Sequence, residues 1–243
     1  MKALLLAAGL GTRLKPITNV TPKCLVEIDG RPLLDYWFEL LSKGGVNEVI
    51  INTHHLADVV SAYLERYTSE IPIHQVYEKN LLGTAGTLLK NRSLYQNEPI
   101  LLIHADNLSI FDLKKFIDAF ANRPKGVEIT MMTFTTDVPE SCGIVELSHE
   151  GIVKNFYEKS KLNHGKIANG AVYIITSSVL NFIASLKKDE IDFSTEVIPA
   201  FLGKINTFHN DIYHRDIGNL SSLELARSEF PPLFKHLHFE DSI

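Results

Sequence analysis

The feature that most limits the fold of this chain is the alternation of short apolar runs with segments of helical periodicity. The apolar runs occupy residues 2–7, 48–52, 71–77, 99–104 and 127–135. Runs of this length are typical of strands buried on both faces of a parallel sheet. Apolar residues recur at helical spacing between them, over residues 32–41, 57–67, 84–91 and 111–121. This order predicts an α/β fold with a doubly wound, mostly parallel sheet.

The pattern changes near residue 137 and predicts a strand-rich C-terminal extension of the same sheet. Strand-like segments cover 143–147, 152–157, 168–175 and parts of 205–213, and helical segments cover 179–187, 195–202 and 220–228. We find no linker sequence, repeat or low-complexity stretch. The sequence therefore predicts a single domain, residues 1–243, made of two halves and a tail. The halves are residues 1–136 and 137–228, and the tail, 229–243, has no clear assignment.

Composition limits the partners and the compartment. Hydrophobic residues make up 45% and charged residues 22%, the mix of a soluble globular protein. The net charge of -5 and the lack of a basic run argue against nucleic-acid binding. No apolar stretch is long enough to span a bilayer, and residues 2–7 lead into a glycine-rich loop rather than a cleavage site. Two isolated cysteines suit a reducing compartment, so we predict a cytoplasmic chain with no membrane partner.

The loop after the first apolar run has the composition of a phosphate-binding turn. Residues 7–16 are AAGLGTRLKP. Gly9 and Gly11 allow a tight turn, and successive backbone N–H groups in such a turn bind anions. Arg13 adds donors that match phosphate oxygens, and Lys23 follows. A tight exit from the strand explains the two glycines without any ligand, and that interpretation stays open.

Two common phosphate loops are excluded. The P-loop pattern needs a Gly-Lys-Ser/Thr sequence, which is absent, and the dinucleotide fingerprint needs a third glycine where this chain has Leu14. The pattern instead resembles the sugar-phosphate nucleotidyltransferase family, whose signature is Gly-x-Gly-Thr-Arg-Leu, a proline and then Pro-Lys. Residues 9–14, Pro16 and Pro22-Lys23 match that signature. The short chain is most similar to compact, mannose-1-phosphate guanylyltransferase-like members.

This resemblance implies a Rossmann-like nucleotidyltransferase fold and an enzyme. The implied reaction transfers a nucleoside monophosphate from a nucleoside triphosphate to a sugar 1-phosphate and releases pyrophosphate. Residues 1–136 would bind the nucleotide and residues 137–228 the sugar phosphate. GTP is the expected nucleoside triphosphate, while UTP, CTP and dTTP stay open, as does the identity of the sugar. A homodimer is also left open.

A second glycine-containing loop, GTAG at residues 83–86, resembles the family's base-binding loop. Thr84 also suits a helix cap, and both interpretations hold together. The resemblance implies that the nucleotide is bound by Ala7, Ala8, Gly9, Gly11, Thr12, Glu78, Gly83, Thr84, Ala85 and Gly86.

Two aspartates follow apolar segments far apart in the chain. Asp106 lies in HADN, where the family has Gly-Asp, and Asp216 lies in HRDIGN, where the family has Trp at the position of His214. The resemblance implies that both aspartates bind Mg²⁺, a hard cation that prefers oxygen ligands. An ordinary helix cap is the alternative for Asp106.

Four further residues are implied to bind the sugar phosphate: Asn107, Glu158, Lys159 and Asn169. For Glu158 and Lys159 the alternative is a solvated charged pair, the commoner state of such residues. Residues 192–199 resemble the family's Asp-Phe segment, which we interpret as structural.

The resemblance assigns catalysis to Arg13 and Lys23. Arg13 would stabilise the departing pyrophosphate, and Lys23 would hold the α-phosphate or the incoming phosphate. A glycosyltransferase that uses a nucleotide-sugar is one alternative, but Arg13 and Lys23 favour a triphosphate. A non-catalytic nucleotide-binding regulatory subunit is another, and the presence of both aspartates argues against it.

Overall fold

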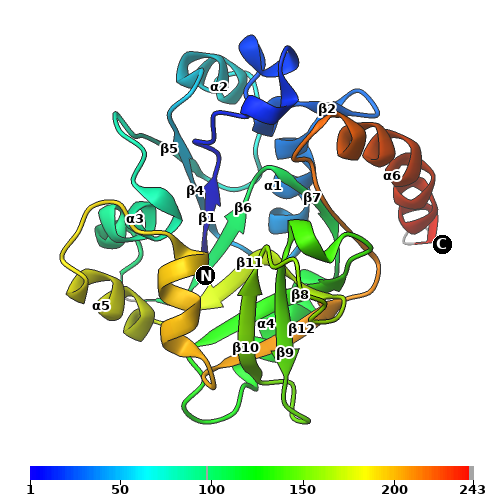
Figure 1. Cartoon of the computed structure of the whole chain (residues 1–243). Helices are drawn as coiled ribbons and strands as arrows, with labels where there is room; N and C mark the ends of the chain where they lie inside the picture. Colours follow the sequence, from blue (N-terminus) through cyan, green and yellow to red (C-terminus); the bar gives the residue numbers. More distant parts are fainter. Residues whose placement is uncertain (97, 241–243) are drawn as a thin grey trace.

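The computed structural model describes residues 1–96 and 98–240, with side chains up to residue 236. Nine strands of these residues form one mixed sheet at the centre of the molecule (Figure 1). Its first half is parallel, in the order β6, β1, β4, β5. These strands are β1 (Lys2–Leu6), β4 (Glu48–Thr53), β5 (Ile73–Tyr77) and β6 (Ile100–His104).

The second half of the sheet is mostly antiparallel and is joined to the first by one long strand. This strand, β11 (Ile167–Ile175), pairs antiparallel with β6, β8 and β9. The remaining pairs are β9 with β10, antiparallel, and β8 with β12, parallel. Their bounds are β8 (Ile129–Thr135), β9 (Gly143–Leu147), β10 (Val153–Glu158) and β12 (Ile205–Asn210).

Helices cover both faces of the sheet, which gives two separate cores. Ala3 and Leu5 of β1 pack with α1 and α4 on one face, and Leu4 packs with α3 and α5 on the other. This division follows from the alternation of side chains along a strand. The helices are α1 (Leu33–Lys43), α2 (Ala57–Leu64), α3 (Gly83–Lys90), α4 (Leu113–Ala121) and α5 (Ser177–Ser185). The predicted doubly wound α/β fold is confirmed.

Two short strand pairs lie outside the main sheet. β7 (Asn107–Ile110) pairs antiparallel with β13 (Tyr213–Asp216), which aligns Asp216 with Asn107. β2 (Glu27–Ile28) and β3 (Arg31–Pro32) form a hairpin before α1. The sequence pattern predicted neither β7 nor its partner strand as such, because strands this short carry almost no periodicity.

The C-terminal part differs from the sequence prediction in two places. The helix predicted for residues 195–202 is a wide π turn over Phe193–Val197 followed by a tight 3₁₀ turn over Ile198–Phe201. Pro199 lacks the N–H that a continuous α-helix would need there. The last helix does not end at residue 228, because α6 spans Leu220–Glu240 and contains Pro231 and Pro232. Part of the predicted tail is therefore helical, and residues 241–243 lie outside the described residues.

Aromatic side chains on both sides of the two prolines pack α6 against the rest of the fold, and the Phe234 ring lies 5.1 Å from Tyr36. Phe230 is fully buried, and its ring lies 4.8 Å from Tyr36 and 5.4 Å from Tyr213 in edge-to-face contacts. Among the described helices, none has both the length and the apolar character that crossing a membrane requires.

Candidate active site

Two neighbouring cavities open beyond the carboxyl ends of the parallel strands. The larger, about 450 Å³, lies between β6, β11 and β13, and the smaller, about 330 Å³, lies between the loop after β1 and α3. His104 and Asp106 line both of them. The register explains this position, because His104 is the last residue of β6 and pairs with Leu6 at the end of β1. In open α/β sheets this edge is where ligands bind.

A lysine and two aspartates form the charged centre beside the larger cavity. The Lys23 ammonium lies 2.5 Å from Asp106 Oδ2 and 3.3 Å from Asp216 Oδ1, although the side chain is only 9% exposed. Burial alone would lower the pKa of Lys23, but the two carboxylates outweigh it and raise the pKa above its usual value. Burial would likewise raise the pKa of Asp106, yet Lys23 keeps that pKa below its usual value. Lys23 and Asp106 are therefore both charged at neutral pH.

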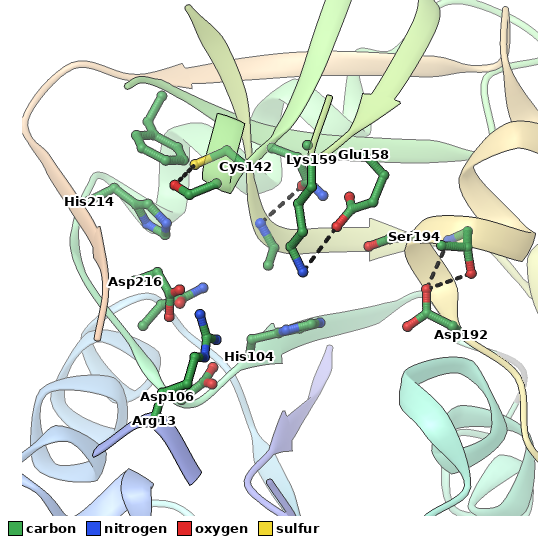
Figure 2. Close-up of a pocket in the computed structure, with 17 residues that line it drawn as sticks. Arg13, His104, Asp106, Cys142, Glu158, Lys159, Asp192, Ser194, His214 and Asp216 are labelled. Atoms are coloured by element: carbon green, nitrogen blue, oxygen red, sulfur yellow. Dashed lines mark hydrogen bonds and ion pairs between the residues drawn. The ribbon is translucent and has the colours of Figure 1, made fainter. Parts of the chain in front are cut away.

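Gly218 gives the second aspartate and Arg13 the room to approach each other. A Cβ atom at Gly218 would stand 2.6 Å from Asp216 Oδ2 and 3.4 Å from Arg13 Nη1. Arg13 also lines the larger cavity, and Figure 2 shows its side chain next to Asp106 and Asp216. The fold thus brings Arg13, Lys23 and both predicted metal ligands to one place.

The donor set at this place is compatible with magnesium. No group of three or more His, Cys, Asp and Glu side chains in the described part of the chain is arranged to hold a metal. Asp106 and Asp216 nevertheless contact the same ammonium, so their oxygens converge on one point. One or two carboxylates completed by substrate phosphate oxygens and water is the usual set for Mg²⁺ at nucleotide sites.

The smaller cavity contains a buried carboxylate. Glu78 is 5% exposed, and its Oε1 accepts hydrogen bonds from Asn52 Nδ2 at 3.0 Å and Thr87 Oγ1 at 2.6 Å. Asn52 is itself oriented by the Ala7 amide, which donates to its Oδ1 at 2.8 Å. No ion pair of Glu78 occurs within the described residues. Its carboxylate is therefore held in one orientation at the cavity wall.

The predicted nucleotide-binding residues divide between the cavity and its supports. Ala8, Gly9, Glu78, Gly83 and Thr84 line the smaller cavity. Five other positions do not line it: Ala7, Gly11, Thr12, Ala85 and Gly86.

The main-chain groups of the second glycine loop are bound within the protein. The amides of Ala85 and Gly86 donate to the Ile191 carbonyl oxygen at 2.9 and 3.2 Å. A Cβ atom at Gly86 would stand 2.3 Å from the Asp189 carbonyl oxygen, so the missing side chain admits residues 189–191. These two amides are therefore not free to contact a base, and the loop is positioned by the C-terminal half.

All four predicted sugar-phosphate residues, Asn107, Glu158, Lys159 and Asn169, line the larger cavity. The Glu158 and Lys159 side chains also form an ion pair at 3.5 Å (Figure 2). The polar groups of the Asn169 side chain form hydrogen bonds within β11. Its Oδ1 accepts from the Ala171 amide at 3.0 Å and its Nδ2 donates to the Tyr173 hydroxyl at 2.6 Å, across the irregular register of β11.

Several cavity residues were not predicted from the sequence: His104, Phe134, Cys142, Asp192, Ser194, Thr195 and His214. The structural interpretation of Asp192 is incomplete, because it caps the turn through the Thr195 amide at 2.8 Å and also borders the cavity. His214 packs on Phe134 with ring centroids 4.3 Å apart, and burial lowers its pKa to about 3. A search of the sequence for charged site residues misses His214, because its side chain is uncharged and lines the cavity without an ion pair.

The sequence model of the Nucleotidyl transferase family matches residues 2–230. The chain belongs to this family. It is 33% identical over 189 residues to mannose-1-phosphate guanylyltransferase 1 of Arabidopsis thaliana, covering 75% of this chain and 52% of that protein. It is also 33% identical over 205 residues to the mannose-1-phosphate guanylyltransferase catalytic subunit beta of Dictyostelium discoideum, covering 82% and 55%. The chain thus spans little more than half the length of these relatives.

A solved structure agrees with the fold of this family member. HddC from Yersinia pseudotuberculosis superposes with a TM-score of 0.80 and 26% identity, covering 94% of this chain and 99% of that one. The same protein has also been solved complexed with GMP-PN. The Rossmann-like arrangement predicted for this family member is confirmed.

Proposed function

We propose that this protein transfers a nucleoside monophosphate from a nucleoside triphosphate onto a sugar 1-phosphate and releases pyrophosphate. The observation that carries the proposal is the convergence of Arg13, Lys23, Asp106 and Asp216 beside the larger cavity. Membership of the nucleotidyl transferase family supports this reaction over a glycosyltransferase or a regulatory subunit.

GTP and mannose 1-phosphate are the proposed substrates. The names of the relatives support both, and the GMP-PN complex of HddC supports a guanine nucleotide. The smaller cavity adds a chemical reason, because the oriented Glu78 carboxylate offers only acceptors. Guanine presents two adjacent N–H donors, N1–H and the N2 amino group, which a carboxylate can bind together. Uracil and thymine present one such donor between two carbonyl oxygens.

The reaction needs no general base, because the attacking sugar-phosphate oxygen is already an anion. Its barrier comes from bringing two anionic groups together, so catalysis consists of positioning and charge neutralisation. Arg13 would stabilise the departing pyrophosphate, Lys23 the α-phosphate and Lys159 the sugar phosphate. Asp106 and Asp216 would hold Mg²⁺, which neutralises phosphate charge when it is bound.

Pyrophosphate release tests the proposal directly. The purified protein is mixed with Mg²⁺, each of the four nucleoside triphosphates in turn and a panel of sugar 1-phosphates. We expect pyrophosphate with GTP and mannose 1-phosphate. Asp106→Asn should slow turnover about 100-fold or more, because it weakens the charged centre. Asp137→Asn is the matched control at a surface residue. Nucleotide-sugar binding without pyrophosphate release from any pair would overturn the proposed reaction.

A further inference from the structure

Two residues, His104 and Asp106, line both cavities, and His104 is the uncharged one. Its ring borders the larger and the smaller cavity, and only Asp106 does the same among the described residues. Figure 2 shows the imidazole extending from the side of Asp106 toward Asp192. The β1–β6 pairing fixes its backbone, because His104 aligns with Leu6.

The imidazole has an unused hydrogen-bonding atom. Nε2 of His104 is buried and has no hydrogen-bond partner among the described residues. Buried polar atoms in proteins nearly always have a partner, so an orphan atom at a cavity wall requires an explanation. The χ2 torsion of histidine has a broad, shallow profile. Rotation of the ring about this torsion is the movement that would bring Nε2 to the cavity that His104 borders.

The position of His104 identifies the missing partner, given the proposed function. A nucleotide in the smaller cavity and a sugar phosphate in the larger one meet at the phosphate that is being transferred. Asp106 is an anion and repels phosphate oxygens, whereas a neutral imidazole offers an N–H donor. His104 is thus the donor at the point where the transferred phosphate must lie.

We infer that His104 is a catalytic residue of this reaction, whose Nε2–H donates to a non-bridging oxygen of the transferred phosphate. Negative charge on these oxygens is redistributed as the phosphoryl group passes between the attacking and leaving oxygens. A preoriented donor stabilises that charge most in the transition state. The contact therefore contributes to kcat more than to the binding of either substrate.

Kinetics of three variants test this role. His104→Phe keeps a flat ring without a donor, His104→Gln keeps an N–H near the position of Nε2, and His149→Phe is the control at an exposed turn. We expect His104→Phe to lower kcat about 10- to 100-fold with KM values within about threefold. His104→Gln should recover most of the loss. A His104→Phe kcat within threefold of the unchanged protein, or a His104→Gln variant that is equally slow, overturns the inference.

An imidazole NMR measurement reports the contact without catalysis. In ¹⁵N-histidine-labelled protein, the His104 signals are identified by their absence from His104→Gln. Adding GDP-mannose or GDP should shift the Nε2 resonance, whereas guanosine, which has no phosphate, should not. Equal shifts with guanosine, or no shift with either phosphate-bearing compound, contradict the contact. A wild-type protein that releases no pyrophosphate would instead defeat the proposed function, and the NMR result would still be decisive for His104.

Discussion

At the residue scale, the central feature is one buried cation between two carboxylates. Lys23 remains charged despite its burial because Asp106 and Asp216 favour the ammonium form. The same contact relieves the repulsion between the two carboxylates. The three residues therefore depend on one another for stability, and Lys23 depends on both carboxylates for its charge.

Removal of the cation should expose that dependence. Lys23→Met leaves Asp106 and Asp216 facing each other without a counter-charge. Because the Asp216 side chain is 53% exposed, solvent screens part of the loss. We expect the free energy of unfolding to fall by about 1–2 kcal/mol in EDTA. Mg²⁺ should then raise Tm more than it does in the unchanged protein. Lys125→Met, at the surface, is the control, and equal Mg²⁺ responses would contradict the prediction.

The Glu78 carboxylate should determine the preference for the base. In Glu78→Gln the amide can still accept from Asn52 and Thr87 through Oε1, but an NH₂ group replaces the second acceptor. We expect kcat/KM for GTP to fall about 100-fold and the ratio of GTP to UTP turnover to fall with it. Glu65→Gln, at an exposed position, is the matched control. An unchanged base preference in Glu78→Gln would remove Glu78 from base recognition.

The Cys24 thiol gives a pH dependence whose sign is defined. Burial raises its pKa from 9.0 to about 12 in the folded protein. Above about pH 9 the unfolded chain ionises first, so stability is lost as the pH rises toward 12. Between pH 8 and 10.5 the stability advantage over Cys24→Ala should shrink by about 2 kcal/mol. Urea unfolding of both proteins at each pH measures the difference in their free energies of unfolding. A difference that does not change with pH would contradict the prediction.

At the element scale, the second glycine loop is held by a segment from the other half of the chain. The Ile191 carbonyl accepts from two of its amides, and the Phe193 amide donates to Thr84 Oγ1 at 2.7 Å. Glu190 lines the smaller cavity, while Asp192 and Ser194 line the larger one. One short segment therefore borders both predicted substrate sites.

Two glycine substitutions should distinguish a glycine that packs within the protein from one that leaves space for the nucleotide. Gly86→Ala places a Cβ atom 2.3 Å from the Asp189 carbonyl oxygen, so we expect a loss of about 2–3 kcal/mol in stability. Gly9→Ala meets no protein atom within 4 Å, although Gly9 lines the smaller cavity. We expect an unchanged Tm and a KM for the triphosphate raised about tenfold. Thermal melts and steady-state kinetics check both, and a destabilised Gly9→Ala would argue against its role as ligand space.

At the scale of the whole molecule, β11 makes one body of the two halves. It pairs with β6 and β8, which belong to residues 1–136, and with β9, which belongs to residues 137–228. The sheet is therefore continuous across residue 136, where the sequence pattern changes. The homodimer stays a prediction, which sedimentation analysis can check.

This continuity predicts a single unfolding transition. The chain has one tryptophan, Trp37, which lies in the first half and is buried in the core beside α4. Its fluorescence reports the first half, whereas far-UV circular dichroism reports all helices and strands. We expect the two signals to give the same urea midpoint. Two separated midpoints would show that the halves unfold independently.

Features that depend on neighbouring residues could be predicted from the amino-acid sequence. Apolar runs and helical periodicity are properties of neighbouring residues, so they predicted the alternating strands and helices and the doubly wound sheet. The Gly9–Lys23 signature likewise pointed to the family, because each of its residues suits a phosphate-binding turn. The helix predicted over residues 220–228 was too short, because α6 continues to Glu240.

Contacts between segments that are distant in the chain became apparent only in the folded structure. Lys23 meets Asp106 and Asp216 across 83 and 193 residues of chain. The Ile191 carbonyl oxygen accepts hydrogen bonds from two amides of the second glycine loop. The register between β1 and β6 places His104 at the wall that both cavities share. No local pattern encodes these pairings, since they follow from the packing of whole elements. The same packing brings Lys23, Asp106 and Asp216 together in one site and leaves His104 Nε2 beside it without a hydrogen-bond partner among the described residues.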